Sequence, residues 1–245
     1  MNNLAQPIKN TKNPERRVGG KIMKVILTYN LFMFEILAIY FVVSKIIDRY
    51  NNIKVDITKR IRNVNVTFHC ERQAVNFIKG NLKLIPAYVL NKFDKEGYAI
   101  HVLSREAFEA TNPGDNVIGY FWPYGKLIVI LFDKNSKTSE YYHLANTVCH
   151  EFGHFIDHCY PMTERISPEG NLITEYLASE RQDLLDVFED AKYLHADDIG
   201  SYYLSSSSEF FAYLSSKFFT KSDFVEKRHK EVFKKALATT FERAK

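Results

Sequence analysis

The 245-residue sequence predicts an α+β fold, in which a small mixed β-sheet packs on helices and a hydrophobic N-terminal helix precedes the domain. Short alternating or continuous apolar stretches between residues 63 and 132 predict strands, and segments with apolar residues at helical spacing separate and follow them. Hydrophobic residues make up 46% of the chain, which argues against a disordered protein. A longer, nearly uncharged apolar run near the N-terminus predicts the additional helix.

That apolar run defines the first part of the domain organisation. Between Lys24 and Lys45 lie 20 residues with a single charged side chain, that of Glu35. The span Val25–Ser44 is long enough to cross a bilayer, although a carboxylate near its centre costs about 2.5–3.5 kcal/mol on insertion scales. We therefore expect residues 25–47 to form a transmembrane or signal-anchor helix.

Two other interpretations of this run stay open. An amphipathic helix packed on the following domain would also supply a long apolar stretch. A cleaved signal peptide is the second alternative, because Ile36–Val43 fits its hydrophobic core. No A-x-A-like cleavage site follows that segment, which argues against the signal peptide.

Basic residues flank the apolar run on both sides. Residues 1–24, a predicted basic tail, hold six Lys or Arg against one acidic residue, and residues 48–62 form a predicted basic linker. The formal net charge of the whole chain is +4, so the part after the linker is net acidic. The basicity belongs to the membrane flanks, where it favours anionic lipid, and it predicts no nucleic-acid binding.

Residues 63–245 are long enough for one domain with its own core, and local patterns assign its elements. Val64, Val66 and Phe68 alternate with polar residues, as on a strand with one buried face. A turn at residues 123–126 separates two apolar stretches, as in a β-hairpin. In chain order we expect strands at 63–69, 99–103, 118–122 and 127–132, and helices at 71–79, 86–96, 140–159, 173–194 and 207–219.

The most specific signal is the pentapeptide His150-Glu151-Phe152-Gly153-His154, an H-E-x-x-H pattern inside the predicted helix 140–159. Residues four apart on a helix share a face, so both imidazoles can bind one zinc ion. The carboxylate of Glu151 can then act as general base toward a water that the metal activates. This pattern is typical of zinc-dependent peptide-bond hydrolysis, and chance would produce it only about 0.01–0.02 times in such a chain.

A third protein ligand decides the class of metallopeptidase. The metzincin continuation is excluded, because Asp157 and Tyr160 stand where that class has Gly and His. A gluzincin instead takes a glutamate from a later helix. Glu209 is the strongest candidate, since it begins an apolar helix and a carboxylate entering a buried segment needs a partner. The alternative is that Glu209 only caps this helix after the serines 205–208.

The pentapeptide, Asp157 and the later segment 208–212, with the sequence S-E-F-F-A, together resemble the family of the anthrax toxin lethal factor catalytic domain and its Pro-Pro endopeptidase relatives. The likeness covers about residues 63–220 and implies a zincin-like metalloprotease domain of the gluzincin class. It departs from the family at Tyr213, where a second acidic residue is usual. Because the family is largely secreted, we expect a membrane-anchored protein that faces outward, or a secreted one.

The resemblance assigns roles that the motif alone leaves open. It implies that Glu209 joins His150 and His154 as the third ligand of Zn²⁺. It also implies that Tyr202, seven residues before Glu209, donates a hydrogen bond to the oxyanion, with the neighbouring Tyr203 as second choice. With Glu151 as general base, these residues would complete a protease that acts on a protein or peptide substrate.

Three further residues are candidates at the edge of this site. Asp157 lies one turn beyond His154 and is predicted to orient an imidazole, with a surface salt bridge as the alternative. The hairpin Ile118–Phe132 is predicted to offer a strand edge that pairs with an extended peptide substrate. Tyr120 and Trp122 would then line the cleft, unless they are ordinary core and turn aromatics.

A different function is also conceivable from these residues. A catalytically silent, membrane-tethered protein with a zincin fold would bind a peptide without cutting it. Glu151 argues against this alternative, because a binding module has no use for a general base. A tethered interaction protein in which the pentapeptide is accidental would bind no zinc at all. Turnover and zinc content therefore separate the three functions.

Overall fold

The structure is a computed structural model that describes residues 14–111, 117–136, 141–167, 170 and 172–242. Within these ranges, the side chains of residues 14–28, 31, 141, 142, 165 and 242 lie outside the description. The chain divides into two compact units, Met1–Tyr50 and Asn51–Lys245.

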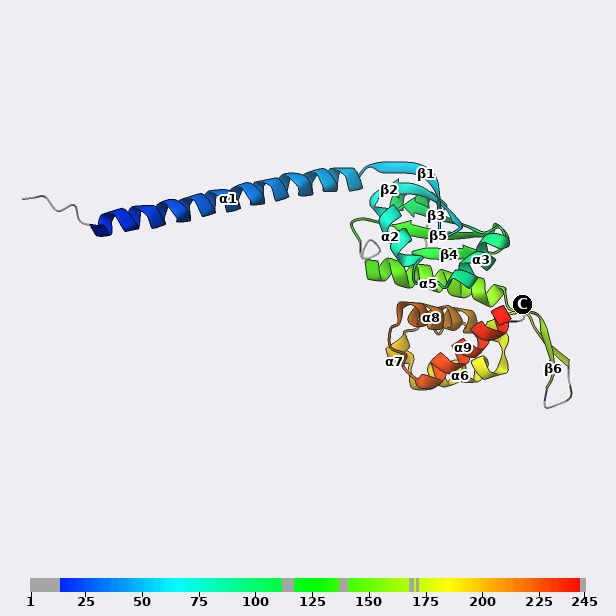
Figure 1. Cartoon of the computed structure of the whole chain (residues 1–245). Helices are drawn as coiled ribbons and strands as arrows, with labels where there is room; N and C mark the ends of the chain where they lie inside the picture. Colours follow the sequence, from blue (N-terminus) through cyan, green and yellow to red (C-terminus); the bar gives the residue numbers. More distant parts are fainter. Residues whose placement is uncertain (1–13, 112–116, 137–140, 168–169, 171, 243–245) are drawn as a thin grey trace, which may run out of the picture. The chain divides into compact units, whose positions relative to one another are not determined.

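In the first unit the described residues form helix α1 (Pro14–Asn51; Figure 1). A single helix has no core of its own, and most of its large apolar side chains from Tyr29 to Tyr50 are exposed. Among the described residues, no helix is long and apolar enough to cross a membrane. The predicted span Val25–Ser44 begins outside the described side chains, so the transmembrane or signal-anchor helix stays a prediction.

The second unit contains a five-stranded mixed sheet with the strand order β1-β2-β3-β5-β4. The three central strands run parallel, and β1 and β4 pair antiparallel at the two edges. The predicted arrangement of a small mixed sheet on helices is confirmed. The strands are β1 (Lys54–Ile61), β2 (Val64–Glu71), β3 (Ala99–Ser104), β4 (Gly119–Trp122) and β5 (Leu127–Phe132).

Strand β5 is buried on both faces of the sheet, as its continuous apolar run requires. Ile128, Ile130 and Phe132 point into the main core, which includes residues of α2 (Gln73–Asn81), α3 (Ala87–Lys95) and α5 (Tyr141–His158). The alternate residues Val129 and Leu131 pack with Phe108 of α4 (Arg105–Thr111) in a smaller cluster.

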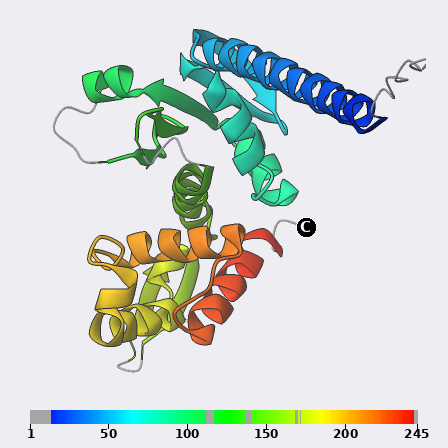
Figure 2. The same cartoon turned by 90° about the vertical axis from the view of Figure 1, so that its left-hand side faces the viewer.

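Helix α5 lies between the sheet and a second layer that is mostly helical (Figure 1 and Figure 2). In that layer α5 packs most closely on α8, and on the side of the sheet it contacts β4 and β5. The predicted helices 140–159 and 207–219 are confirmed. The second layer contains the helices α6 (Gln182–Leu194), α7 (Ala196–Ile199), α8 (Ser207–Thr220) and α9 (Lys227–Glu242).

Residues 48–62 differ from the predicted basic linker, because they include β1, which pairs with β2 along its whole length. Val55 and Ile61 of this strand are buried, whereas the basic side chains between them are exposed. The abundance of exposed charge conceals the apolar alternation on this edge strand. The sheet therefore starts before residue 63, the predicted beginning of the domain.

The predicted helix 173–194 is also different in the structure. Its first part is strand β7 (Leu172–Glu175), which forms a hairpin with β6 (Thr163–Ile166), and a 3₁₀ turn, η2 (Ala178–Glu180), follows. The Glu180 carboxylate accepts the backbone N–H groups of Tyr176 and Leu177, so the chain turns before α6 begins. Helix α9 was not predicted, because its short apolar face is set among many Lys and Glu.

Candidate metal centre

Helix α5 carries the pentapeptide, and its packing fixes the direction of both imidazoles. Phe152 and Phe155 point toward the sheet side and pack on Phe93, with ring centroids 5.0 and 4.9 Å away. The imidazoles of His150 and His154 share the other side of the helix, where their ring centroids lie 4.9 Å apart. The spacing of four residues thus places the two imidazoles together, as predicted.

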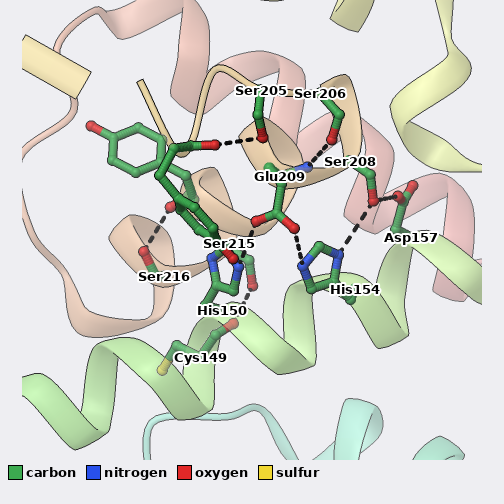
Figure 3. Close-up of polar contacts among 12 residues, drawn as sticks. Cys149, His150, His154, Asp157, Ser205, Ser206, Ser208, Glu209, Ser215 and Ser216 are labelled. Atoms are coloured by element: carbon green, nitrogen blue, oxygen red, sulfur yellow. Dashed lines mark hydrogen bonds and ion pairs between the residues drawn. The ribbon is translucent and has the colours of Figure 1, made fainter. Parts of the chain in front are cut away.

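Helix α8 brings a carboxylate to the same place. The side chain of Ser206 caps this helix by accepting the backbone N–H of Glu209 at 3.1 Å. Glu209 therefore lies in the first turn, where the helix dipole stabilises a negative charge. Its carboxylate points toward the two imidazoles of α5 (Figure 3).

A glycine inside the pentapeptide allows the two helices to approach each other closely. A Cβ atom at Gly153 would lie 2.6 Å from Cα of Ala212 and 2.7 Å from Cβ of Ser215, both on α8. Ser215 stabilises the contact between α5 and α8 by donating a hydrogen bond to the carbonyl oxygen of Cys149 at 2.9 Å. Small residues at this contact let Glu209 reach α5.

The three side chains converge with the spacing of a metal site. His150 Nε2 lies 3.0 Å from Glu209 Oε2, and His154 Nε2 lies 3.4 Å from Glu209 Oε1. One atom from each residue lies within 4.8 Å of the others, and no other such group of three occurs among the described residues. Bonds of about 2.0–2.1 Å to a tetrahedral zinc ion place two ligand atoms roughly 3.3–3.4 Å apart, so this donor set fits such an ion.

The electrostatics of the site separate the roles of its two glutamates. Burial would raise the pKa of the Glu209 carboxyl, but hydrogen bonds with His150 and His154 outweigh it and hold that pKa well below its usual range. Burial raises the pKa of the Glu151 carboxyl, and the nearby imidazoles only oppose this effect. Glu209 is therefore suited to remain an anion that holds a cation, whereas Glu151 is suited to accept a proton.

Two cavities of about 340 and 360 Å³ flank Glu151. Glu151, Gly119 and Tyr202 line both of them. A Cβ atom at Gly119 would lie 3.2 Å from Glu151 Oε1, so this glycine lets the edge strand β4 approach the carboxylate closely. Tyr120 lines the smaller cavity, whereas Trp122 lines neither and lies over Gly125 in the turn.

Both tyrosine rings lie beside His150, with centroids 6.2 Å away for Tyr202 and 5.7 Å for Tyr203, and Tyr202 also interacts with Glu209. Burial raises the pKa of the Tyr202 phenol, and the charge of Glu209 and a hydrogen bond with it raise that pKa further. The phenol therefore keeps its proton and stays a hydrogen-bond donor. The Tyr203 ring also packs on Tyr213, with centroids 5.0 Å apart, and of the two cavities Tyr203 lines the larger one.

Asp157 is buried, with 2% of its surface exposed, so it is not a surface salt-bridge residue. Its carboxylate accepts the backbone N–H and the hydroxyl of Ser179 at 2.7 and 2.9 Å, and the hydroxyl of Ser208 at 2.9 Å. Burial raises the pKa of the Asp157 carboxyl, and these three hydrogen bonds oppose the rise. Ser208 links Asp157 to His154, because its Oγ lies 3.3 Å from His154 Nδ1 (Figure 3).

Sequence reasoning missed the function of four residues at this centre. Ser208 was visible only as part of the helix cap, although its place directly before Glu209 is a usable signal. Gly153 and Gly119 matter through close approach, which no local pattern reveals. Ser179 comes from the turn η2, which the sequence did not predict.

Comparisons with known proteins place this chain in a family. Among solved structures, the chain is similar to the Pro-Pro endopeptidase from Paenibacillus alvei, with 16% sequence identity, a TM-score of 0.43, and coverage of 73% of this chain and 94% of that chain. None of the curated proteins compared with it matches the chain. The family model of the glucose-regulated metallo-peptidase M90 matches residues 99–242, more than half of the chain. The chain therefore belongs to the glucose-regulated metallo-peptidase M90 family.

Proposed function

We propose that this metallopeptidase is a zinc-dependent endopeptidase. The observation that carries the proposal is the convergence of one ligand atom each from His150, His154 and Glu209 within 4.8 Å, beside the buried carboxyl of Glu151. Two imidazoles and a carboxylate are a ligand set of catalytic zinc sites, which keep a fourth position open. The resemblance to lethal factor-like proteases supports the same choice of metal.

The residues of the site divide the work of hydrolysis among them. His150, His154 and Glu209 would hold Zn²⁺, which when bound supplies a Lewis acid and lowers the pKa of a water. Glu151 takes a proton from the attacking water and delivers it to the nitrogen of the departing amine. Tyr202 donates a hydrogen bond to the carbonyl oxygen of the scissile bond as negative charge develops there.

The edge of the sheet supports an extended peptide as the substrate. Strand β4 is the last strand of the sheet and pairs only with β5 in the described part of the chain. Leu131 donates its N–H to Ile118, so the antiparallel register turns the backbone groups of Gly119 and Phe121 away from β5. A substrate strand can pair there, with side chains on either side of the cut entering the two cavities.

Cleavage of a diverse peptide library by the full chain tests the proposal. We expect cutting that stops with a chelator, returns with Zn²⁺, and falls by about 10²–10⁴-fold in Glu151→Gln at unchanged zinc content. Glu226→Gln, which lies outside the site, is the matched control and should cut as the wild type does.

Each other outcome rejects a named part of the proposal. A folded chain that retains no zinc would exclude the metal assignment. Undiminished cutting by Glu151→Gln would exclude that residue as the base. A zinc-loaded chain that binds peptides but cuts none would favour the catalytically silent, peptide-binding alternative.

A further inference from the structure

The two histidines of the metal centre differ in what holds the ring nitrogen that faces away from Glu209. His154 Nδ1 lies 3.3 Å from Oγ of Ser208, and that hydroxyl donates to Oδ2 of Asp157 at 2.9 Å. His150 Nδ1 is buried and has no hydrogen-bond partner among the described residues. Ser208 and Asp157 therefore support the imidazole of His154, and among the described residues no such pair supports that of His150.

The direction of the two hydrogen bonds between His154, Ser208 and Asp157 follows from the number of hydrogens available. A serine hydroxyl has one hydrogen, and Ser208 gives it to Asp157. The Ser208 oxygen can then only accept a hydrogen from His154, so Nδ1 must carry it. In the neutral ring this contact leaves Nε2 with a free lone pair that can bind a metal. Without a metal, Glu209 opposes this arrangement, because its carboxylate faces Nε2 and can accept a hydrogen from it.

Asp157 is held so that it can only accept. The backbone N–H of Ser179 donates to Oδ1, and the hydroxyls of Ser179 and Ser208 donate to Oδ2. These donors come from η2 and α8, whereas Asp157 and His154 belong to α5. The arrangement ties three elements together around the outer side of one imidazole.

We propose that Asp157 and Ser208 are positioning residues that hold His154 in the tautomer whose Nε2 binds the metal. The inference rests on the proposed function, because it takes His150, His154 and Glu209 as the metal ligands. Removing a group that hydrogen-bonds a ligating histidine typically weakens metal binding by about 10–100-fold. Without the Ser208 hydroxyl, the ring of His154 can rotate or exchange its proton between the two nitrogens.

The first test compares zinc affinity in the full chain by competition with a chromophoric chelator. We expect Ser208→Ala to bind zinc about 10–100-fold more weakly than the wild type. Ser207→Ala, the adjacent position on α8, should keep the wild-type affinity, and Ser208→Thr, which retains a hydroxyl, should recover most of it. Equal affinities of Ser208→Ala and the wild type would overturn the proposal.

A second test reads the tautomer itself and needs no variant that could fail to fold. In the metal-free full chain at about pH 9, where histidine is ordinarily neutral, nitrogen NMR should show a larger share of hydrogen on Nδ1 in the His154 ring than in the His150 ring, whose Nδ1 has no hydrogen-bond partner among the described residues. Equal shares in the two rings of the wild type would overturn the proposal. In Asp157→Asn the new side chain can donate an N–H to Ser208, which reverses the direction of both hydrogen bonds. We therefore expect the hydrogen of His154 to lie on Nε2 in this variant.

These tests separate this inference from the proposed function. Absence of zinc binding by the wild type would reject the metal site itself, whereas the tautomer in the metal-free chain is observed independently of it. Wild-type zinc binding that does not change in Ser208→Ala would reject only the positioning role.

Discussion

The second unit contains two clusters that each combine two histidines with a glutamate. In the metal cluster, His150, His154 and Glu209 face one another, and both imidazoles contact the same carboxylate. In the second cluster, His195 contacts Glu226 at 2.7 Å, whereas His229 has no hydrogen-bond partner for either ring nitrogen among the described residues. The same residue types therefore form two different kinds of site.

The difference lies in the backbone that carries each pair. The metal histidines stand four apart on one helix, and their ring centroids lie 4.9 Å apart. His195 lies between α6 and α7 and His229 lies on α9, with centroids 6.0 Å apart. The His229 ring packs edge-on against Phe210 of α8, as a core aromatic residue would. Ligand chemistry thus requires convergent geometry in addition to the right side chains.

The largest contrast between the clusters is expected in metal binding. Glu209→Gln should abolish zinc retention through dialysis, because it replaces a charged ligand by a neutral amide, and this loss should exceed the 10–100-fold effect of residues that only support a ligand. Glu226→Gln makes the same chemical change in the second cluster and should leave the zinc content of the full chain unchanged. Zinc content is measured by elemental analysis, and equal loss in both variants would contradict the assignment of the metal to the first cluster alone.

A smaller effect is expected from the phenol beside the metal cluster. Tyr202→Phe removes one hydrogen-bond donor to the developing oxyanion and should lower kcat by about 10²–10³-fold at unchanged zinc content. Tyr203→Phe is the matched control, because its ring packs on Tyr213 and should be retained. Measured kcat values for both variants decide between the two tyrosines, and a larger loss in Tyr203→Phe would reverse the assignment.

The contrast between the clusters also explains which parts could be predicted from the sequence. The pair His150 and His154 was predictable because helical spacing is local, and Glu209 because an acidic residue before an apolar run is unusual. Ser208 was visible only as a helix-capping residue, since its contact with Asp157 depends on how α5 and α8 pack. That packing depends on Gly153, whose role is the absence of a side chain.

Local sequence patterns also predicted only part of the fold. Strands β2, β3 and β5 were predictable because buried parallel strands are apolar throughout or alternate clearly. Strand β1 was hidden, because an edge strand with five exposed residues carries its charge on the solvent side. Strands β6 and β7 have only four residues each, too few for a clear alternation. Helix α9 has its buried residues Val232, Phe233, Ala236 and Leu237 at helical spacing, but the many charged residues among them obscure this signal.

The second cluster should make the free energy of unfolding depend on pH through His229. Burial lowers the pKa of His229, and the positive charges of His195 and Arg228 lower it further, although Glu226 and Asp190 oppose them. The unfolded chain takes up a proton near the ordinary histidine value of about 6.5, whereas the folded chain does so only at lower pH. The free energy of unfolding should therefore fall as the pH falls from about 6.5 toward the lowered pKa of His229.

Replacing His229 by a residue that does not titrate isolates this contribution. In His229→Leu, the free energy of unfolding of the metal-free chain should fall less steeply below about pH 6.5 than in the wild type. His229→Phe, with a larger side chain, separates packing from titration, because it should change the stability at all pH values while keeping the shallow slope. Urea denaturation at several pH values measures both quantities. Equal slopes in the wild type and both variants would contradict a lowered pKa of His229 in the folded chain.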